Sequence, residues 1–175
     1  MSFVLSGLAL LLALQAPKAP QGAVSRPPAE LSQLRTFVGT WTCDGKSPAV
    51  QGAPERRVRA TVKIAPDLDG FWYSVRYEEA ESGGLRGQAY WGYDPAARHF
   101  VETAIDNAGG VGSSTSPGWQ VDRFVWTGDV VLEGSRTSVR DTFSKRGPEI
   151  LHSSEAEIDG KWTLVLQETC RAPVH

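Results

Sequence analysis

The chain has 175 residues, of which 41% are hydrophobic and 22% are charged, and its formal net charge is −2. This length suits one domain with a sizeable core, and the composition is that of an ordinary globular protein. A charge so close to zero provides neither a basic footprint for nucleic acid nor a polybasic patch for a membrane surface, so we expect neither partner.

The chain begins with an apolar segment. Residues 1–16 contain no charged side chain and fall short of the ~20 residues that span a bilayer, so they are typical of a secretory signal peptide. We expect cleavage near Ala16 or as late as Ala23; an uncleaved segment that anchors the chain to a membrane is the alternative. The mature protein is then extracytoplasmic, either periplasmic or secreted. Residues 17–28 contain four prolines and predict a disordered linker.

A short helix that runs into a strand opens the domain, which we expect over residues 29–175. Leu31, Leu34 and Val38 are spaced three and four apart and predict one apolar helix face. Gly39 ends the helix, and from Trp41 onward the period becomes two. We expect the helix to plug one end of a barrel, with the Trp41 indole filling the bottom where strands converge.

Short alternating runs fill the rest of the chain. Turn residues separate them, among them Asp69-Gly70, Asp94-Pro95 and Asp159-Gly160, of which the last is the strongest hairpin signal. The pattern gives about ten strands, and short connections make neighbouring strands antiparallel. The sequence therefore predicts an all-β fold, an antiparallel up-and-down β-barrel, because closure removes exposed sheet edges. A two-sheet sandwich is the alternative.

The two cysteines lie on the first and last predicted strands, at Cys43 and Cys170. These strands are neighbours in a closed barrel, and an oxidising compartment favours disulfides, so we expect the two residues to be bonded. Two unpaired buried thiols are the alternative. No metal site is predicted, because neither cysteine belongs to a C-x-x-C motif or has a histidine near it in the sequence.

Four motifs occur in order: G-T-W-T-C, L-D-G-F-W, Y-W-G-Y-D-P and D-N-A-G. Together they resemble DUF1579, a bacterial family of uncharacterised lipocalin-like domains, over residues 31–171. The Gly39–Trp41 motif is similar to the Gly-x-Trp signature of the calycins, whose distant relatives include nitrobindin-like haem barrels. The resemblance implies a barrel but no activity. It also implies that Arg171 packs over the Trp41 indole, as a late arginine does in lipocalins; a surface arginine is the alternative.

A barrel of this size can enclose one small ligand. We therefore expect a secreted, lipocalin-like protein that binds a small apolar molecule. The candidate ligand-binding residues are aromatic or polar side chains assigned to inward strand positions: Tyr73, Tyr77, Tyr90, Trp126 and His152. No cofactor is expected; haem is the alternative, and His152 is its candidate axial ligand because it shares a mixed face with Ile150 and Ser154.

Two further classes of function stay open. An envelope interaction or structural protein would act through its outer surface, with Trp72 and Trp91 exposed as contacts. An enzyme would need convergent polar groups, and Glu102 and Asp106 share a strand face that could form an acid/base pair. We assign no catalytic residue and do not expect an enzyme. Cavity volume separates the classes, because an interior of several hundred Å³ favours ligand carriage.

Overall fold

The computed structural model describes residues 26–50, 52–132 and 134–172. The predicted signal peptide and most of the predicted linker lie outside these residues. Across the described ranges, no helix has the length and apolar character that crossing a membrane requires.

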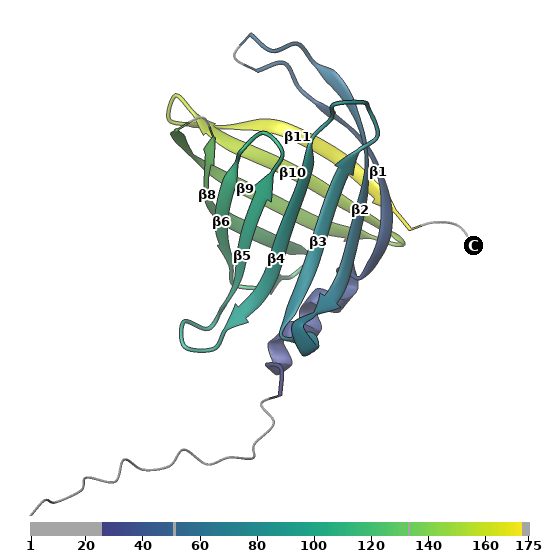
Figure 1. Cartoon of the computed structure of the whole chain (residues 1–175), viewed down its shortest axis with the longest axis vertical. Coiled ribbons are helices and arrows are strands. Elements are labelled where there is room, and N and C mark those ends of the chain that lie inside the picture. The colour runs from purple at the N-terminus through teal and green to yellow at the C-terminus, as the bar shows by residue number, and fades with distance from the viewer. Residues whose placement is uncertain (1–25, 51, 133, 173–175) are drawn as a thin grey trace, which may run out of the picture.

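Eleven antiparallel strands form one sheet that closes into a barrel (Figure 1). Strands β1 to β6 are paired in chain order, β11 to β8 continue from the other side of β1, and β6 pairs with β8 to close the ring. Ten strands form the wall, while β7 is a two-residue strand paired with β8. The strands are β1 Gly39–Ser47, β2 Arg56–Asp67, β3 Trp72–Glu79, β4 Arg86–Asp94, β5 His99–Asp106, β6 Val111–Ser116, β7 Trp119–Gln120, β8 Arg123–Leu132, β9 Ser135–Arg146, β10 Glu149–Ile158 and β11 Lys161–Arg171. The predicted up-and-down barrel is confirmed, and the sandwich is excluded.

A 3-10 helix, η1 (Ala29–Phe37), covers one end of the barrel, and a shorter one, η2 (Leu68–Gly70), lies beside it (Figure 1). The predicted plug is present, but its apolar face differs. Leu31, Leu34 and Phe37 are buried, whereas Val38 is 39% exposed. A 3-10 helix has three residues per turn, so positions three apart share a face and Val38 falls outside it.

Phe37 is the centre of an aromatic cluster at this end. Its ring stacks on Trp119 with centroids 5.5 Å apart, and the rings of Trp91, Phe124 and Phe143 meet it edge-on at 5.5 to 5.6 Å. Such edge-to-face arrangements are those that aromatic quadrupoles favour. Phe37 therefore fills the position that the sequence suggested for Trp41.

Trp41 secures the junction between η1 and β1. Its indole Nε1 donates a hydrogen bond to the carbonyl oxygen of Phe37 at 2.8 Å, and its half-buried ring packs against the core. Gly39, between them, has a φ of 141°, a conformation that residues with a side chain rarely adopt. Trp41 thus holds the plug in place and does not itself form it.

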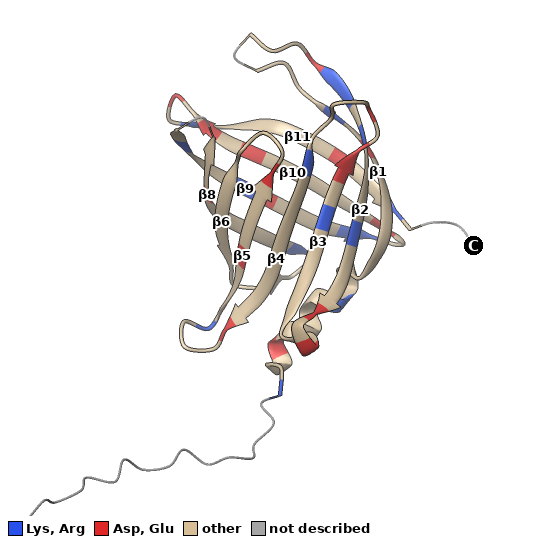
Figure 2. Ribbon diagram, in the orientation of Figure 1, with Lys and Arg blue, Asp and Glu red and all other residues tan. Residues whose placement is uncertain are grey.

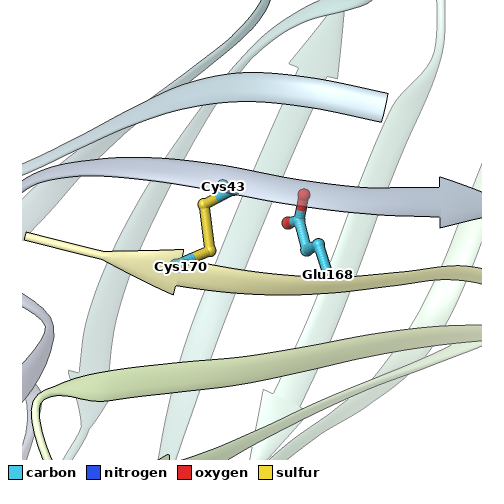
Figure 3. Close-up of side chains that lie close together, drawn as sticks. All are labelled: Cys43, Glu168 and Cys170. Carbon is cyan, nitrogen blue, oxygen red and sulfur yellow. A yellow bond between two sulfur atoms is a disulfide. The ribbon is translucent and has the colours of Figure 1, made fainter. Parts of the chain in front are cut away.

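The seam between β1 and β11 is closed by the predicted disulfide. Cys43 and Cys170 are cross-strand neighbours, both are buried, and their sulfurs are bonded (Figure 3). Because adjacent strand residues face opposite ways, Arg171 points outward. Its Nε donates to Glu149 Oε1 at 2.7 Å, so this arginine is a surface residue and does not cover the Trp41 indole.

Charged residues of both signs are interspersed along the wall (Figure 2). Some form ion pairs: Arg59 on β2 lies 3.1 Å from Asp44 on β1, and Lys46 on β1 lies 3.4 Å from Glu55, just before β2. Exposed pairs of this kind contribute ~0–1 kcal/mol each. The barrel is therefore held by its hydrogen-bonded ladder, its core and its disulfide far more than by surface charge.

Candidate functional site

A cavity of about 470 Å³ lies inside the barrel, within the range of ~300–1,000 Å³ that is usual for ligand pockets. Phe37 forms part of its lining at the plugged end. Part of the wall consists of small inward-facing residues on β4, β5 and β6, namely Gly87, Ala89, Ala104 and Gly112. Larger side chains at these positions would fill a barrel of this size, so the sequence leaves the space open here.

Three of the five residues predicted to bind a ligand line this cavity: Tyr77, Trp126 and His152. Tyr73 is buried in the core and borders a separate hollow beside η1. Tyr90 lies on the outer face of β4, where its hydroxyl accepts a hydrogen bond from Gln88 Nε2 at 3.2 Å. The inward assignment of Tyr90 is therefore wrong, and Tyr73 faces inward without lining the cavity.

The reason lies in the alternation of β4. Trp91 and Ala89 are buried and point inward, which turns Tyr90 outward. Trp91, expected as an exposed contact, is 3% exposed, so that expectation is wrong. Trp72 is half-buried, and its ring lies so close to Gly92 that a Cβ there would approach it to 2.6 Å.

His152 lies between two carboxylates. Its Nδ1 is 2.9 Å from Glu168 Oε1 and its Nε2 is 3.1 Å from Asp141 Oδ1, while its ring stacks on Phe143 at 4.4 Å. Burial by itself lowers the pKa of His152, but hydrogen bonds to Asp141 and Glu168 and their negative charges outweigh burial and raise this pKa above its ordinary value. The imidazole is thus held as a cation that donates from both nitrogens.

This geometry does not suit an axial ligand of haem. Iron binding requires a free nitrogen lone pair, whereas both ring nitrogens of His152 are directed at carboxylate oxygens. His152 would have to release Asp141 or Glu168 before it could bind iron. The arrangement of these three residues therefore does not fit a haem ligand.

Glu102 is a second polar centre facing the cavity. Its Oε1 accepts a hydrogen bond from Trp91 Nε1 at 2.8 Å. Removal from bulk water and the charge of Asp141 raise the pKa of Glu102 to about 7, against the opposing effect of hydrogen bonds from Trp91 and Ser114 and the charge of His152. Glu102 is therefore partly protonated at neutral pH.

Asp106 shares the inward face of β5 with Glu102, as expected, but its carboxylate serves a turn. Oδ1 of Asp106 accepts hydrogen bonds from the backbone nitrogens of Ala108 and Gly110, each at 2.8 Å. Such bonds are typical of an Asp that stabilises a tight turn. The carboxylate whose charge raises the pKa of Glu102 is Asp141 on β9, so the suggested Glu102–Asp106 pair is not formed.

Asp141 and Glu168 are not among the residues predicted from the sequence. Glu168 stands two residues before Cys170 and therefore shares its inward face; it is 3% exposed and lies beside the disulfide (Figure 3). Asp141 stands two residues before Phe143 and is inward for the same reason. Counting back from Cys170 would have identified Glu168.

Glu168 and the sulfurs of Cys43 and Cys170 lie within 4.8 Å of one another. This spacing suits a metal ion, but the two sulfurs are bonded to each other. Cysteine binds a metal as its thiolate, which the disulfide does not offer. The cluster is therefore a disulfide with a neighbouring carboxylate.

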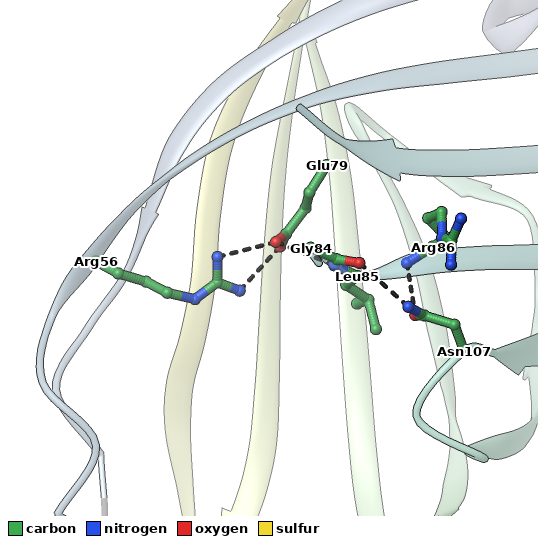
Figure 4. Close-up of polar contacts among 6 residues, drawn as sticks. All are labelled: Arg56, Glu79, Gly84, Leu85, Arg86 and Asn107. Carbon is green, nitrogen blue, oxygen red and sulfur yellow. Dashed lines mark hydrogen bonds and ion pairs between the residues drawn. The ribbon is translucent and has the colours of Figure 1, made fainter. Parts of the chain in front are cut away.

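At the open end, Arg56 and Glu79 border the mouth of the cavity (Figure 4). The two terminal nitrogens of Arg56 donate to the two oxygens of Glu79 at 3.1 and 2.8 Å, and the backbone nitrogen of Leu85 donates to Glu79 Oε2 at 3.2 Å. Asn107 Nδ2 donates to the carbonyl oxygen of Gly84 at 3.2 Å, which joins two neighbouring turns. These bonds hold the rim in one shape.

Comparisons with known proteins give a matching family and a similar solved fold. The family model described as "Protein of unknown function (DUF1579)" matches residues 26–118. No curated protein matches the chain. Among solved structures, the crystal structure of Rv2717c from M. tuberculosis is similar, with a TM-score of 0.66 and 11% sequence identity over 85% of this chain and 100% of that chain. A likeness at this identity concerns the fold alone.

Proposed function

The chain belongs to the DUF1579 family of proteins of unknown function, and on this premise we propose that it is a lipocalin-like binding protein that holds a small, largely apolar molecule in its barrel. The observation that carries the proposal is the cavity of about 470 Å³. A few polar groups face this space, among them Glu102 and His152, and the rest of its lining is mainly apolar and aromatic. This combination is typical of small-molecule sites, in which polar groups set the orientation of an apolar ligand.

An extracytoplasmic location belongs to the same proposal. The apolar residues 1–16 and the bond between Cys43 and Cys170 support it, because structural disulfides persist in oxidising compartments. An interaction role through the outer surface is less favoured, since Trp91, one of its two expected contacts, points inward.

Filling the cavity tests the proposal. The uncharged fluorophore N-phenyl-1-naphthylamine should bind the full chain saturably at one site. Ala104→Trp places an indole in the cavity and should weaken binding by about tenfold or more, since an occupied pocket excludes the probe. Thr103→Trp is the matched control, because Thr103 is the next residue along β5 and is exposed on the outer face; it should bind as wild type does.

Thermal melts of both variants show whether the barrel is intact. If Ala104→Trp unfolds, Ala89→Phe fills the same space from β4. Equal probe binding by wild type and by a folded, cavity-filled variant would overturn the proposal, as would an absence of saturable binding to wild type.

A further inference from the structure

We propose that the occupant of the barrel is a protonated primary amine with an apolar body, and that its ammonium group lies beside Glu102 and Asp141. This inference rests on the proposed function, because it names the class of ligand that the same cavity takes.

Most of the ionisable side chains that line the cavity are acidic. Its bases, among the described residues, are Arg56 and His152. Its carboxylates are Glu79, Glu102, Asp106, Asp141 and Glu168. The negative side chains therefore outnumber the positive ones five to two.

Two of these carboxylates are accounted for near the mouth. Glu79 is paired with Arg56 at 2.8 Å, and Asp106 caps its own turn. The remaining three face the interior with His152.

The interior group has one cation for three acids. His152 holds Glu168 and Asp141 at 2.9 and 3.1 Å, and Glu102 lies close enough for both Asp141 and His152 to affect its ionisation. With His152 as a cation, a protonated Glu102 leaves a net charge of −1 on these four residues, and an ionised Glu102 leaves −2. Uncompensated charge away from bulk water is costly, so a cation is the occupant that this group favours and an anion is the one that it repels.

An unused acceptor points to a ligand with N–H groups. Glu168 Oε2 is buried and has no hydrogen-bond partner among the described residues. Buried polar atoms are nearly always paired, and an ammonium offers three N–H donors where a quaternary amine offers none. The indoles of Trp91 and Trp126, 5.5 Å apart, add aromatic surface for a cation and for an apolar body.

The second unpaired atom refines the body of the ligand. Trp126 lines the cavity, and its buried Nε1 has no acceptor among the described residues. A hydroxyl or ether oxygen on the apolar body would accept this bond. The amine itself is tested first, because it answers the larger electrostatic imbalance.

Three competitors of equal chain length separate the charge of the ligand from its size. Octylamine, octanol and octanoate are each titrated against N-phenyl-1-naphthylamine bound to the full chain, at a pH of about 8, where an alkylamine is protonated and Glu102 is mostly ionised. Octylammonium should compete at a concentration about tenfold or more below that of octanol, and octanoate should be the weakest, since opposite charges attract strongly where water is scarce.

Two variants that each lose one negative charge show whether the preference for octylammonium depends on a carboxylate inside the cavity. Glu102→Gln should remove most of the preference for octylammonium over octanol. Glu157→Gln is the matched control, because Glu157 is an exposed residue on the outer face of β10; it should keep the full preference. If Glu102→Gln does not fold, as judged by its thermal melt, Asp141→Asn replaces it.

The outcomes distinguish the two proposals. Displacement by octanol or octanoate at the same concentration as octylammonium would overturn this inference and leave the proposed function standing. An amine preference that survives both Glu102→Gln and Asp141→Asn would also overturn it. Failure of the fluorophore to bind wild type would remove the proposed function, and this inference with it.

Discussion

Replacing Phe37 by Ala tests the structural plug directly. Phe37 is 1% exposed and is surrounded by four aromatic rings at 5.5 to 5.6 Å. A buried Phe covers ~150–250 Å², which at ~25 cal/mol per Å² gives about 4 to 6 kcal/mol. Core Phe→Ala changes cost ~3–5 kcal/mol. We expect about 4 kcal/mol, because the hydrogen-bonded wall cannot collapse into the space.

Equilibrium urea unfolding, followed by circular dichroism, measures this loss. Trp41→Phe keeps an aromatic ring but removes the bond to the Phe37 carbonyl, so it should cost only ~0.5–1.5 kcal/mol. Val38→Ala, at a residue 39% exposed, should stay within ~0.5 kcal/mol of wild type. The reasoning fails if Phe37→Ala unfolds within 1 kcal/mol of wild type, or if Trp41→Phe costs as much as Phe37→Ala.

Two further predictions concern the seam and Glu102. The variant with both Cys43→Ala and Cys170→Ala frees a loop whose ends are 127 residues apart. Its free energy of unfolding should therefore fall by up to about 5 kcal/mol in the chain-entropy model. Urea titration of oxidised wild type is the reference, and a loss below 1 kcal/mol would contradict the expected effect. The pKa of Glu102 is raised from 4.5 to about 7, so its contribution to stability is complete below its unfolded pKa and is lost as the pH rises through 7, a change on the order of 3 kcal/mol. Glu102→Gln should abolish that part of the pH dependence, and identical pH profiles for the two proteins would refute it.

Local patterns predicted most of the fold. Asp159 and Gly160 both have positive φ, 51° and 73°, as the hairpin signal of that dipeptide requires. Val58, Ala60 and Ile64 are buried in the alternation expected for β2. Such features depend on neighbours in the sequence, so one chain is enough to find them.

The site depended on contacts between residues of different strands. Asp141 shares the inward face of β9 with Phe143 and contacts His152 on β10 there, whereas a carboxylate in an alternating strand is by default assigned to the solvent face. Around Tyr90, aromatic residues stand on both faces of β4, so the sequence pattern does not show which face points into the barrel. In η1 the predicted buried residue was Val38, whereas the buried one is Phe37, because η1 is a 3-10 helix. Helix periods of 3.0 and 3.6 residues cannot be separated over so few turns.

The disulfide and the charged group are connected through the same strand pair. Cys43 lies opposite Cys170, and Gly45 lies opposite Glu168. A Cβ at Gly45 would come within 2.5 Å of the Glu168 Cβ, so the glycine provides the room that Glu168 occupies. A slip of one residue between β1 and β11 would turn Glu168 to the outer face and leave Nδ1 of His152 without its acceptor. Because the bond between the cysteines forbids this slip, it fixes the position of the carboxylate as well as closing the barrel.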